Sequence, residues 1–292
     1  MWMFFCMLLA NAAYATADEI LSVVDDAGNT VMLTQPAQRI VSLAPHITEL
    51  LYAAGAGDKV VGVVAYSDFP EAAKKVSQVG SYNAFDLETI LALRPDLIVA
   101  WKSSNPTSAI QKLQAFSIPV FFSEPRQLED VATNLRRLGK LTGSESVANA
   151  ASATFMRKLS ALRNKYKDVK PVSVFYQIWH QPLMTINGEH IISQVIELCG
   201  GRNVFADLPT LAPKISLEPV LHKDPEVIVT GNSALIYPSW KDDWARWPTL
   251  RAVKNEHLFY INPDIIQRHT PRILQGTEVL CEQLSRVRAS SS

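Results

Sequence analysis

Apolar and polar residues alternate along the chain in short runs that predict strands and helices in turn. Continuous apolar runs at residues 60–64, 97–100 and 227–230 have the length and β-branched content of buried strands. Between them, segments such as residues 127–141 carry an apolar residue every three or four positions, which predicts helices with one buried face. This alternation predicts the α/β class, with mainly parallel sheets covered on both faces.

The full chain continues the pattern after a predicted β-hairpin at residues 20–24 and 30–33. The expected strands are residues 39–43, 60–64, 97–100, 120–122, 172–178, 227–230 and 258–261. The expected helices are residues 45–54, 107–116, 127–141, 144–168, 191–199, 217–222 and 272–287, with a further short helix capped by Asp86.

One helix–turn–strand motif occurs twice. Residues 87–101 and residues 217–231 place Leu, Glu, Leu, Pro, Ile and Val at matching positions, 217 − 87 = 130 residues apart, and Asp96 corresponds to Glu226. A single repeat at this distance predicts two similar Rossmann-like lobes. Residues 144–168 contain neither Pro nor Gly and predict one helix of about 37 Å. We expect this stiff helix to join the lobes, although it could also be a crossover helix inside one sheet.

The first residues differ from the rest of the chain. Residues 1–9 are almost wholly apolar and several alanines follow, which is typical of a secretory signal peptide, although the usual basic residues are missing. The alternative is a disordered or packed N-terminus. We therefore expect a signal peptide at residues 1–17, an N-terminal lobe at 18–143, a linking helix at 144–168 and a C-terminal lobe at 169–292.

Export would leave two cysteines, Cys199 and Cys281. An oxidising compartment would let them pair and close a loop of 281 − 199 = 82 residues. The alternative is two buried free thiols.

Composition and motifs argue against several functions. Lys and Arg together number 28, as do Asp and Glu, and no polybasic run points to nucleic acid or a membrane surface. The sequence lacks a dinucleotide fingerprint, a phosphate-binding loop, a nucleophile elbow and a zinc-protease helix. His46 and Glu49 have helical spacing but are too few for a metal site.

Large aromatic residues follow the predicted strands. Ligands of open parallel sheets bind beyond the carboxyl ends of the strands, so these side chains are candidates for a flat, mostly apolar ligand. Individual aromatics could instead fill a core. The candidates are Tyr66, Tyr82, Trp101, Trp179 and His180, then Tyr237, Trp240, Trp244 and Trp247, followed by the polar residues Asp264 and Arg268.

The repeated motif also places Glu88 and Glu218 in equivalent first helical turns. The simplest interpretation is that each carboxylate complements its helix dipole. The functional interpretation is that the two acids dock on a pseudo-symmetric partner that carries arginines. The sequence pattern by itself favours the first.

Several short motifs together resemble a known family. They are Arg39-Ile-Val-Ser-Leu-Ala-Pro45, Tyr66-Ser-Asp68, Leu87-Glu88 through Asp96-Leu-Ile98, Leu198-Cys-Gly-Gly201 and Thr270-Pro-Arg272. As a set, over residues 38–287, they resemble the periplasmic vitamin B12-binding proteins of ABC importers, which are relatives of haem- and siderophore-binding proteins. The resemblance implies two Rossmann-like lobes joined by a rigid helix, with the ligand in the cleft between them.

The resemblance also implies roles for individual residues. It places Tyr66, Tyr82 and Trp101 at the ligand, although the best-matched member has tryptophan at the position of Tyr82; Trp179 is expected there from its position after the strand at residues 172–178. Trp240 or Trp244 is expected to form the second lobe's aromatic wall. Cys199 and Cys281 match a disulfide pair, and Glu88 and Glu218 match two acids that meet arginines of the membrane permease subunits. The ligand-contacting segment corresponds to Asp264, Ile265, Ile266, Gln267 and Arg268, and its centre is less aromatic here than in the family.

The sequence therefore predicts a monomeric, periplasmic protein that captures cobalamin and delivers it to an ABC importer, without catalysis or a cofactor. A haem- or siderophore-binding protein of the same fold is the first alternative, and haem would require His46, His180 or a tyrosine as axial ligand. A metal-dependent two-lobe α/β enzyme is the second, and would require a cluster of His and carboxylate ligands that the sequence does not show.

Overall fold

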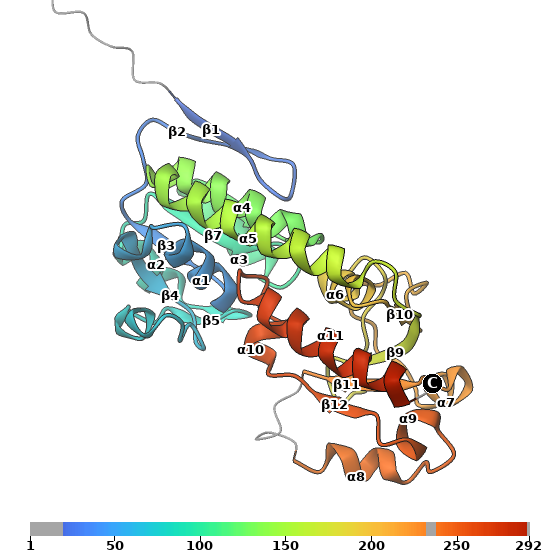
Figure 1. The fold of residues 1–292 in the computed structure, drawn as a ribbon. Helices are drawn as coiled ribbons and strands as arrows, with labels where there is room; N and C mark the ends of the chain where they lie inside the picture. The colour runs from blue at the N-terminus through green and yellow to red at the C-terminus, as the bar shows by residue number, and fades with distance from the viewer. Residues whose placement is uncertain (1–19, 232–237, 291–292) are drawn as a thin grey trace, which may run out of the picture.

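Two four-stranded parallel sheets form the centre of the protein in a computed structural model that describes residues 20–231 and 238–290 (Figure 1). The first sheet has the strand order β4-β3-β7-β8, and a separate antiparallel hairpin, β1-β2, precedes it. The bounds are β1 (Leu21–Val24), β2 (Thr30–Leu33), β3 (Ile40–Ser42), β4 (Val60–Val63), β7 (Leu97–Trp101) and β8 (Val120–Ser123), with a small pair β5 (Gly80–Ser81) and β6 (Ala84–Phe85). The helices of this lobe are α1 (Pro45–Ala53), α2 (Leu87–Ala92), α3 (Thr107–Ala115) and α4 (Leu128–Thr142), with 3₁₀ turns η1 (Gly57–Lys59) and η2 (Glu71–Lys75).

The second sheet has the order β10-β9-β11-β12 and repeats the parallel arrangement. Its strands are β9 (Val172–Gln177), β10 (Gly201–Asn203), β11 (Val227–Thr230) and β12 (Leu258–Tyr260). The helices are α6 (Ile191–Leu198), α7 (Glu218–Lys223), α8 (Trp240–Ala245), α9 (Arg251–Lys254), α10 (Pro263–Ile266) and α11 (Ile273–Ser290). The predicted α/β class with parallel sheets is confirmed. Strand β10 and helices α8, α9 and α10 were not predicted, because each is too short to show a periodic apolar pattern.

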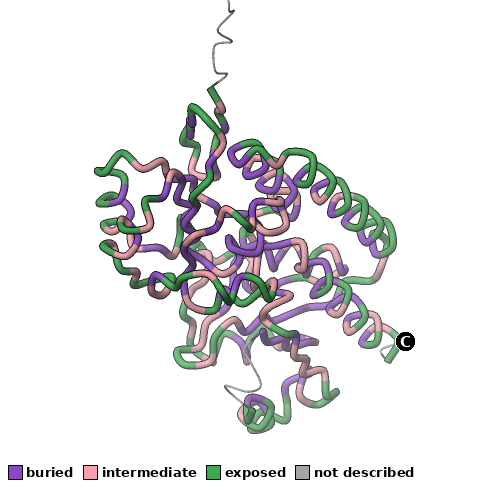
Figure 2. The backbone as a smooth tube through the Cα atoms, turned by 90° about the vertical axis from the view of Figure 1, so that its left-hand side faces the viewer, coloured by how far each residue is buried: buried purple, intermediate pink, exposed green. Residues whose placement is uncertain are grey.

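The predicted long helix is present as α5 (Glu145–Tyr166), which has 22 residues and runs beside α4 across both lobes (Figure 1). Its buried face includes Ala148, Phe155 and Leu159. One apolar core is continuous from Ile40 in the first sheet to Val174 in the second, while each lobe also has a smaller core of its own. Strands β3, β9 and β11 consist of buried residues, whereas α5 alternates buried and exposed positions; Figure 2 shows such buried and exposed stretches along the backbone. Helix α5 and the shared core together limit how freely the lobes can move.

The sequence repeat corresponds to a structural repeat. Arg94 and Asp224, which are 130 positions apart, both adopt left-handed backbone angles, with φ of 46° and 41°, after α2 and α7. The acids that follow them also act alike. Asp96 accepts hydrogen bonds from the backbone N–H groups of Gln38 and Arg39, just before β3, and Glu226 accepts them from the N–H and hydroxyl of Ser173 in β9. Each acid thus fixes the start of the neighbouring central strand.

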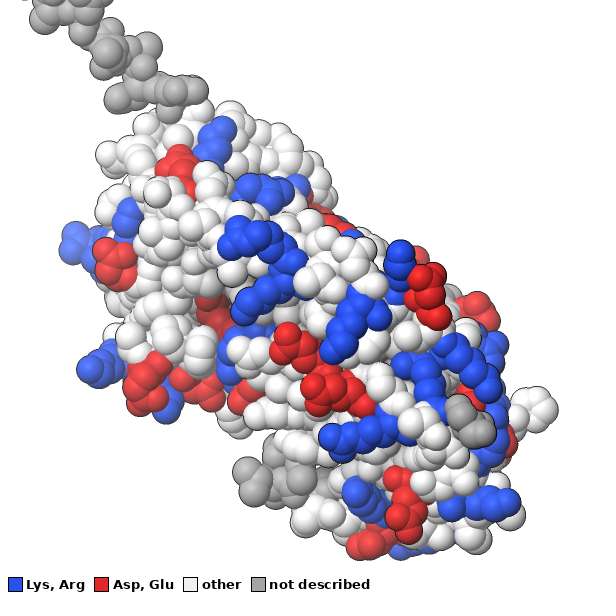
Figure 3. All heavy atoms as spheres, in the orientation of Figure 1, with Lys and Arg blue, Asp and Glu red and all other residues white. Residues whose placement is uncertain are grey.

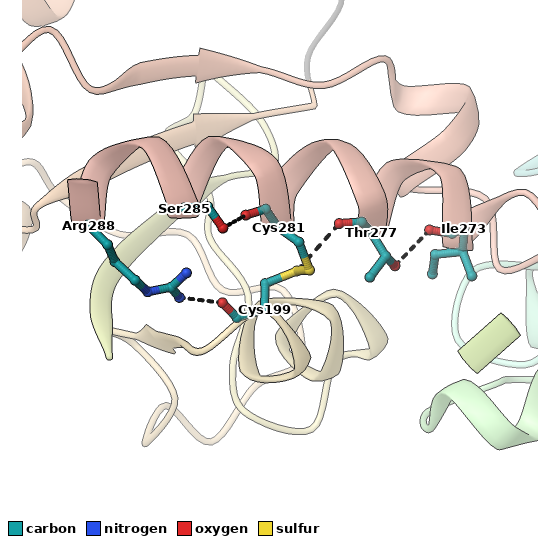
Figure 4. Close-up of a disulfide and its surroundings, with 6 residues drawn as sticks. All are labelled: Cys199, Ile273, Thr277, Cys281, Ser285 and Arg288. Carbon is teal, nitrogen blue, oxygen red and sulfur yellow. Dashed lines mark hydrogen bonds between the residues drawn. A yellow bond between two sulfur atoms is a disulfide. The ribbon is translucent and has the colours of Figure 1, made fainter. Parts of the chain in front are cut away.

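A disulfide joins Cys199, at the end of α6, to Cys281 in α11 (Figure 4). The Cα atoms are 4.6 Å apart, within the range that disulfides span, and both residues are fully buried. The guanidinium of Arg288, near the C-terminal end of α11, donates to the Cys199 carbonyl and so also links α11 to the end of α6 (Figure 4). The expected pairing is confirmed, and the alternative of two free thiols is excluded.

Charged side chains of both signs are interspersed over the face shown in Figure 3, as expected from the equal numbers of acids and bases. Within residues 20–231 and 238–290, no helix is both long enough and apolar enough to cross a membrane. The expected signal peptide at residues 1–17 lies outside the described residues.

Candidate ligand-binding site

The carboxyl ends of the two sheets meet at a seam between the lobes. Tyr66 and Asp68 follow β4 in the first lobe, and Arg268 follows β12 in the second. The Arg268 guanidinium donates to Asp68 Oδ1 at 2.7 Å and to the Tyr66 carbonyl at 3.3 Å, and pairs with Asp264 at 2.8 Å. Two sheets whose carboxyl ends converge in this way present the loops where α/β proteins hold their ligands.

Aromatic side chains are exposed at this seam. Tyr66, Tyr82 and Trp179 expose 78%, 42% and 47% of their surface, which is unusual for residues of this size. Trp101 is half-buried, and its ring centroid lies 6.1 Å from that of Tyr82. Tyr66 also adopts a left-handed φ of 66°, a conformation that costs free energy for a non-glycine residue and is concentrated at functional sites. The first lobe therefore offers an aromatic surface, made of Tyr66, Tyr82 and Trp101.

Two buried histidines, His46 of the first lobe and His269 of the second, pack against Trp101, and a third, His190, packs against His269. His46 contacts the Trp101 ring edge-on at a centroid distance of 4.9 Å, and His269 lies 5.4 Å from His46 and 5.8 Å from His190. Burial lowers the pKa of His190 to about 3 and that of His269 to about 4, and it also lowers the pKa of His46. The imidazoles are therefore neutral near pH 7, so Trp101 rests on an uncharged base.

This arrangement bears on the haem alternative. His46 is only 4% exposed, and its Nε2 is buried without a hydrogen-bond partner, so the ring does not reach a ligand at the surface. His180 is more accessible, but it lies 3.7 Å from Asp243 in the second lobe. Among the described residues, no group of three or more His, Cys, Asp or Glu side chains could hold a metal ion.

The segment from Asp264 to Arg268 divides between surface and core. The carboxylate of Asp264 is accessible, and Arg268 spans the seam. Gln267 lies beside the hydroxyl of Tyr176, with Nε2 at 3.4 Å. Ile265 packs partly against the shared core, and Ile266 is fully buried in it. The position of Ile266 in the short helix α10 turns its side chain toward the core, and its contact with a ligand stays a prediction.

Trp240 and Trp244 are buried in the second lobe. Their exposures are 4% and 5%, both belong to the core of that lobe, and the Trp244 ring packs edge-on against Phe175. They are four residues apart in α8 and so share the face that the helix buries. Trp244 borders a pocket of about 330 Å³ together with Trp247 and His180, and its Nε1 donates to Gln177 at 2.8 Å. The role of Trp240 or Trp244 as an aromatic wall stays a prediction. Trp179 and Trp247 are the exposed tryptophans among the described residues of this lobe, and Tyr237 lies outside the described residues.

Gly231 explains why the repeat is asymmetric at the strand exits. It occupies the place in the second lobe that Trp101 occupies in the first. A Cβ atom at position 231 would collide with the hydroxyl of Tyr176 and the amide of Gln267. A side chain at this position would require both groups to shift, which disfavours an aromatic residue at this strand exit.

Glu88 and Glu218 are both exposed in the first turns of α2 and α7. Asp86 caps α2 by accepting from the Glu88 N–H at 2.9 Å, as predicted. In the second copy Leu217 occupies the cap position, and Ser216 instead hydrogen-bonds the Glu218 side chain, which lowers the pKa of that carboxyl. The structure thus leaves both carboxylates open to solvent.

A buried acid at the seam was missed from the sequence. Glu49 in α1 is 2% exposed and accepts from Thr270 Oγ1 at 2.5 Å and from Arg272 Nε and Nη2 at 2.8 and 2.7 Å. The Arg272 guanidinium also lies 3.8 Å from the centroid of the Phe69 ring. More than 220 residues separate the partners, so no local pattern could have paired them. An acid in an otherwise apolar helix is the only signal that the sequence offers.

Two α/β lobes with parallel sheets, one long connecting helix and an aromatic surface at the seam are the features of a two-lobed ligand-binding protein. Residues 40–265 match the family described as periplasmic binding protein, and the chain belongs to this family. Its relatives share nearly the whole chain. It is 38% identical over 260 residues to a vitamin B12-binding protein of Vibrio parahaemolyticus, a match that covers 88% of this chain and 93% of that protein.

A second relative, the vitamin B12-binding protein of Vibrio campbellii, is 40% identical over 254 residues, with 87% of this chain and 91% of that protein covered. Among solved structures, the periplasmic vitamin B12-binding protein BtuF of Vibrio cholerae superimposes with a TM-score of 0.81 at 38% identity, covering 87% of this chain and 98% of that one. The haem-binding protein RhuT of Roseiflexus shares the fold with a TM-score of 0.76 at 21% identity.

Proposed function

We propose that this chain binds cobalamin between its lobes in the periplasm and delivers it to an ABC importer. The observation that carries the proposal is the likeness, at 38–40% identity over nearly the whole length, to proteins named for vitamin B12 binding. The haem-binding relative shares the fold at only 21% identity, which makes haem the weaker candidate. Binding and delivery require no catalysis and no cofactor.

The aromatic surface suits a corrinoid. Cobalamin presents a wide, flat macrocycle with polar groups at its rim, and aromatic side chains can cover such a face with large contact areas. Tyr66, Tyr82 and Trp101 supply this contact from the first lobe, and Trp179 from the second. Asp264 and Arg268 supply donors and acceptors for the rim. Cobalt needs no protein ligand in this arrangement.

Calorimetric titration of the purified protein with cyanocobalamin and with haemin tests the proposal. We expect saturable one-to-one binding of cyanocobalamin and a Tyr82→Ala variant that binds it about tenfold more weakly. Phe116→Ala is a matched control, because Phe116 is 62% exposed but lies at the end of α3, beside the amino end of β8. Tight haemin binding with a Soret band and no heat from cyanocobalamin would refute the assignment.

Delivery would use Glu88 and Glu218 as two matched contacts for arginines of the permease subunits. The double variant Glu88→Arg, Glu218→Arg should abolish cobalamin uptake by cells and leave binding in solution unchanged. Glu71→Arg with Glu145→Arg is the control, since these acids also lie in first helical turns and are exposed. Normal uptake by the first double variant would exclude this docking mode.

Export would precede both steps and would remove residues 1–17, leaving a monomer. Mass spectrometry of the protein purified from the periplasm tests this, because the mature chain should begin at Asp18. A full-length mass in the cytoplasmic fraction would contradict export.

A further inference from the structure

The side chain of Asn105 joins three loops of the first lobe. Its Oδ1 accepts from the Trp101 backbone N–H at 2.6 Å, and its Nδ2 donates to the carbonyls of Leu43 at 3.0 Å and Tyr82 at 2.6 Å. Trp101 is the last residue of β7, Leu43 follows β3, and Tyr82 lies in the turn between β5 and β6, while Asn105 itself lies in the loop after β7. Asn105 is only 6% exposed, so water does not compete for these bonds.

Only an amide of this size can make all three contacts. The site needs one acceptor and two N–H donors on a short side chain, and asparagine provides both. Aspartate would keep the acceptor for Trp101 but would turn an oxygen toward two carbonyl oxygens. Leucine would fill the space and leave three backbone groups unsatisfied, which is costly in a buried site.

The three loops carry the aromatic surface. Trp101 and Tyr82 are bonded through their own backbone atoms, and Leu43 lies three residues before His46, whose ring supports Trp101. The turn that holds Tyr82 is short. The side-chain hydroxyl of its neighbour Ser81 hydrogen-bonds Asn83 and Ala84, which lie in or next to the same turn. The bond from Asn105 therefore links Tyr82 directly to the loop of Trp101.

We propose that Asn105 is a positioning residue, which sets the separation and tilt of Tyr82 and Trp101 for a bound ligand. The inference rests on the proposed function for the identity of that ligand, a corrinoid. The amide itself touches no ligand, because its polar atoms are used by the three backbone groups. It acts by holding the two rings in place before the ligand arrives, so that binding does not have to order them.

The second lobe contains a matched control. Asn203 is 5% exposed, its Nδ2 donates to the Ile186 carbonyl and Ser193 Oγ, both at 2.9 Å, and its Oδ1 accepts from the Phe205 N–H at 2.9 Å. The chemistry matches that of Asn105. Phe205, however, is buried in the core of the second lobe and packs against Phe175. Loss of this amide should lower stability without moving the aromatic surface.

The experiment compares Asn105→Asp with Asn203→Asp in the mature protein. Thermal unfolding reports the structural cost, titration with cyanocobalamin reports affinity, and ¹⁹F NMR of 5-fluorotryptophan-labelled protein reports the environment of Trp101, assigned with Trp101→Phe. We expect both variants to lose thermal stability. Only Asn105→Asp should bind about tenfold more weakly and shift the Trp101 resonance, while Asn203→Asp stays within about twofold of wild type.

If Asn105→Asp does not fold, Asn105→Ser supplies the test, since its hydroxyl can keep one of the three bonds; it should weaken binding and shift the same resonance. The proposal is overturned if the Asn105 variant that folds binds as wild type does, or loses no more affinity than Asn203→Asp. If wild type itself binds no cyanocobalamin, the proposed function fails instead. The Trp101 resonance still decides the positioning role in that case, because an unshifted signal contradicts it without reference to any ligand.

Discussion

Replacing Glu49 with glutamine should weaken the connection between the two lobes. The carboxylate, 3% exposed, accepts from Thr270 and Arg272 across the seam, and Arg268 Nη1 lies 3.9 Å away. Glutamine keeps the shape but removes the charge and turns one amide group toward the Arg272 guanidinium. Arg268 retains Asp68 and Asp264 as partners, whereas Arg272 loses its carboxylate.

The magnitude follows from this geometry. Breaking a buried ion pair by neutralising one partner costs about 3–5 kcal/mol, because the other charge remains in a poor solvent. The Arg272 side chain is 18% exposed, so water partly compensates it and the lower end, about 3 kcal/mol, applies. A chain of this size loses about 2–4 °C in Tm for each kcal/mol, which gives a decrease of about 6–12 °C.

Thermal unfolding followed by far-UV circular dichroism at pH 7 measures this decrease. The control is Glu71→Gln, which removes a carboxylate whose side chain is 81% exposed and pairs with Lys74 at 2.7 Å. Exposed pairs contribute little, so its Tm should stay within about 1 °C of wild type. Equal changes in Tm for the two variants would refute the idea that Glu49 ties the lobes together.

Two further predictions concern stability. Replacing both Cys199 and Cys281 with serine opens a loop of 82 residues. The chain-entropy estimate gives a loss of at most about 4–5 kcal/mol in the free energy of unfolding, measured with guanidinium. A loss below about 1 kcal/mol would contradict a structural role for the disulfide. The pKa of His269 is lowered by burial to about 4, so only the unfolded chain takes up this proton as the pH falls below about 6.5. Stability, measured as Tm, should therefore fall as the pH is lowered from about 6.5 to about 4. His269→Gln should make Tm depend less steeply on pH without removing the dependence, because burial also lowers the pKa of His190. A pH dependence identical to that of wild type would show that His269 is not buried as a neutral ring.

The sequence could predict the elements that have strong local patterns. The apolar runs of β7 and β11, the spacing along α4 and α5, and the cap at Asp86 all depend on neighbouring residues, and all are present. The repeat aligned Asp96 with Glu226, and the structure shows that both make matching bonds to the central strands. The cysteine pairing, in contrast, depended on the inference of export to an oxidising compartment and on the family resemblance, because spacing alone also allowed two free thiols.

The remaining features depend on contacts between distant segments. Trp240 and Trp244 follow a strand, as ligand contacts often do, but the face of α8 that carries them packs on Phe175, and no local pattern reveals which face that is. Ile266 is buried for the same kind of reason. Glu49 hydrogen-bonds Thr270, 221 positions away, and Asn105 hydrogen-bonds Leu43, 62 positions away. Neither contact can be recognised before the chain is folded.

A crystal structure of the mature protein with cyanocobalamin tests the central claim most directly. We expect the corrin between the lobes, with its face against Tyr66, Tyr82 and Trp101 and its rim within hydrogen-bonding distance of Asp264 or Arg268. Corrin density bound away from the seam, with these side chains unchanged and in contact only with solvent, would contradict the account.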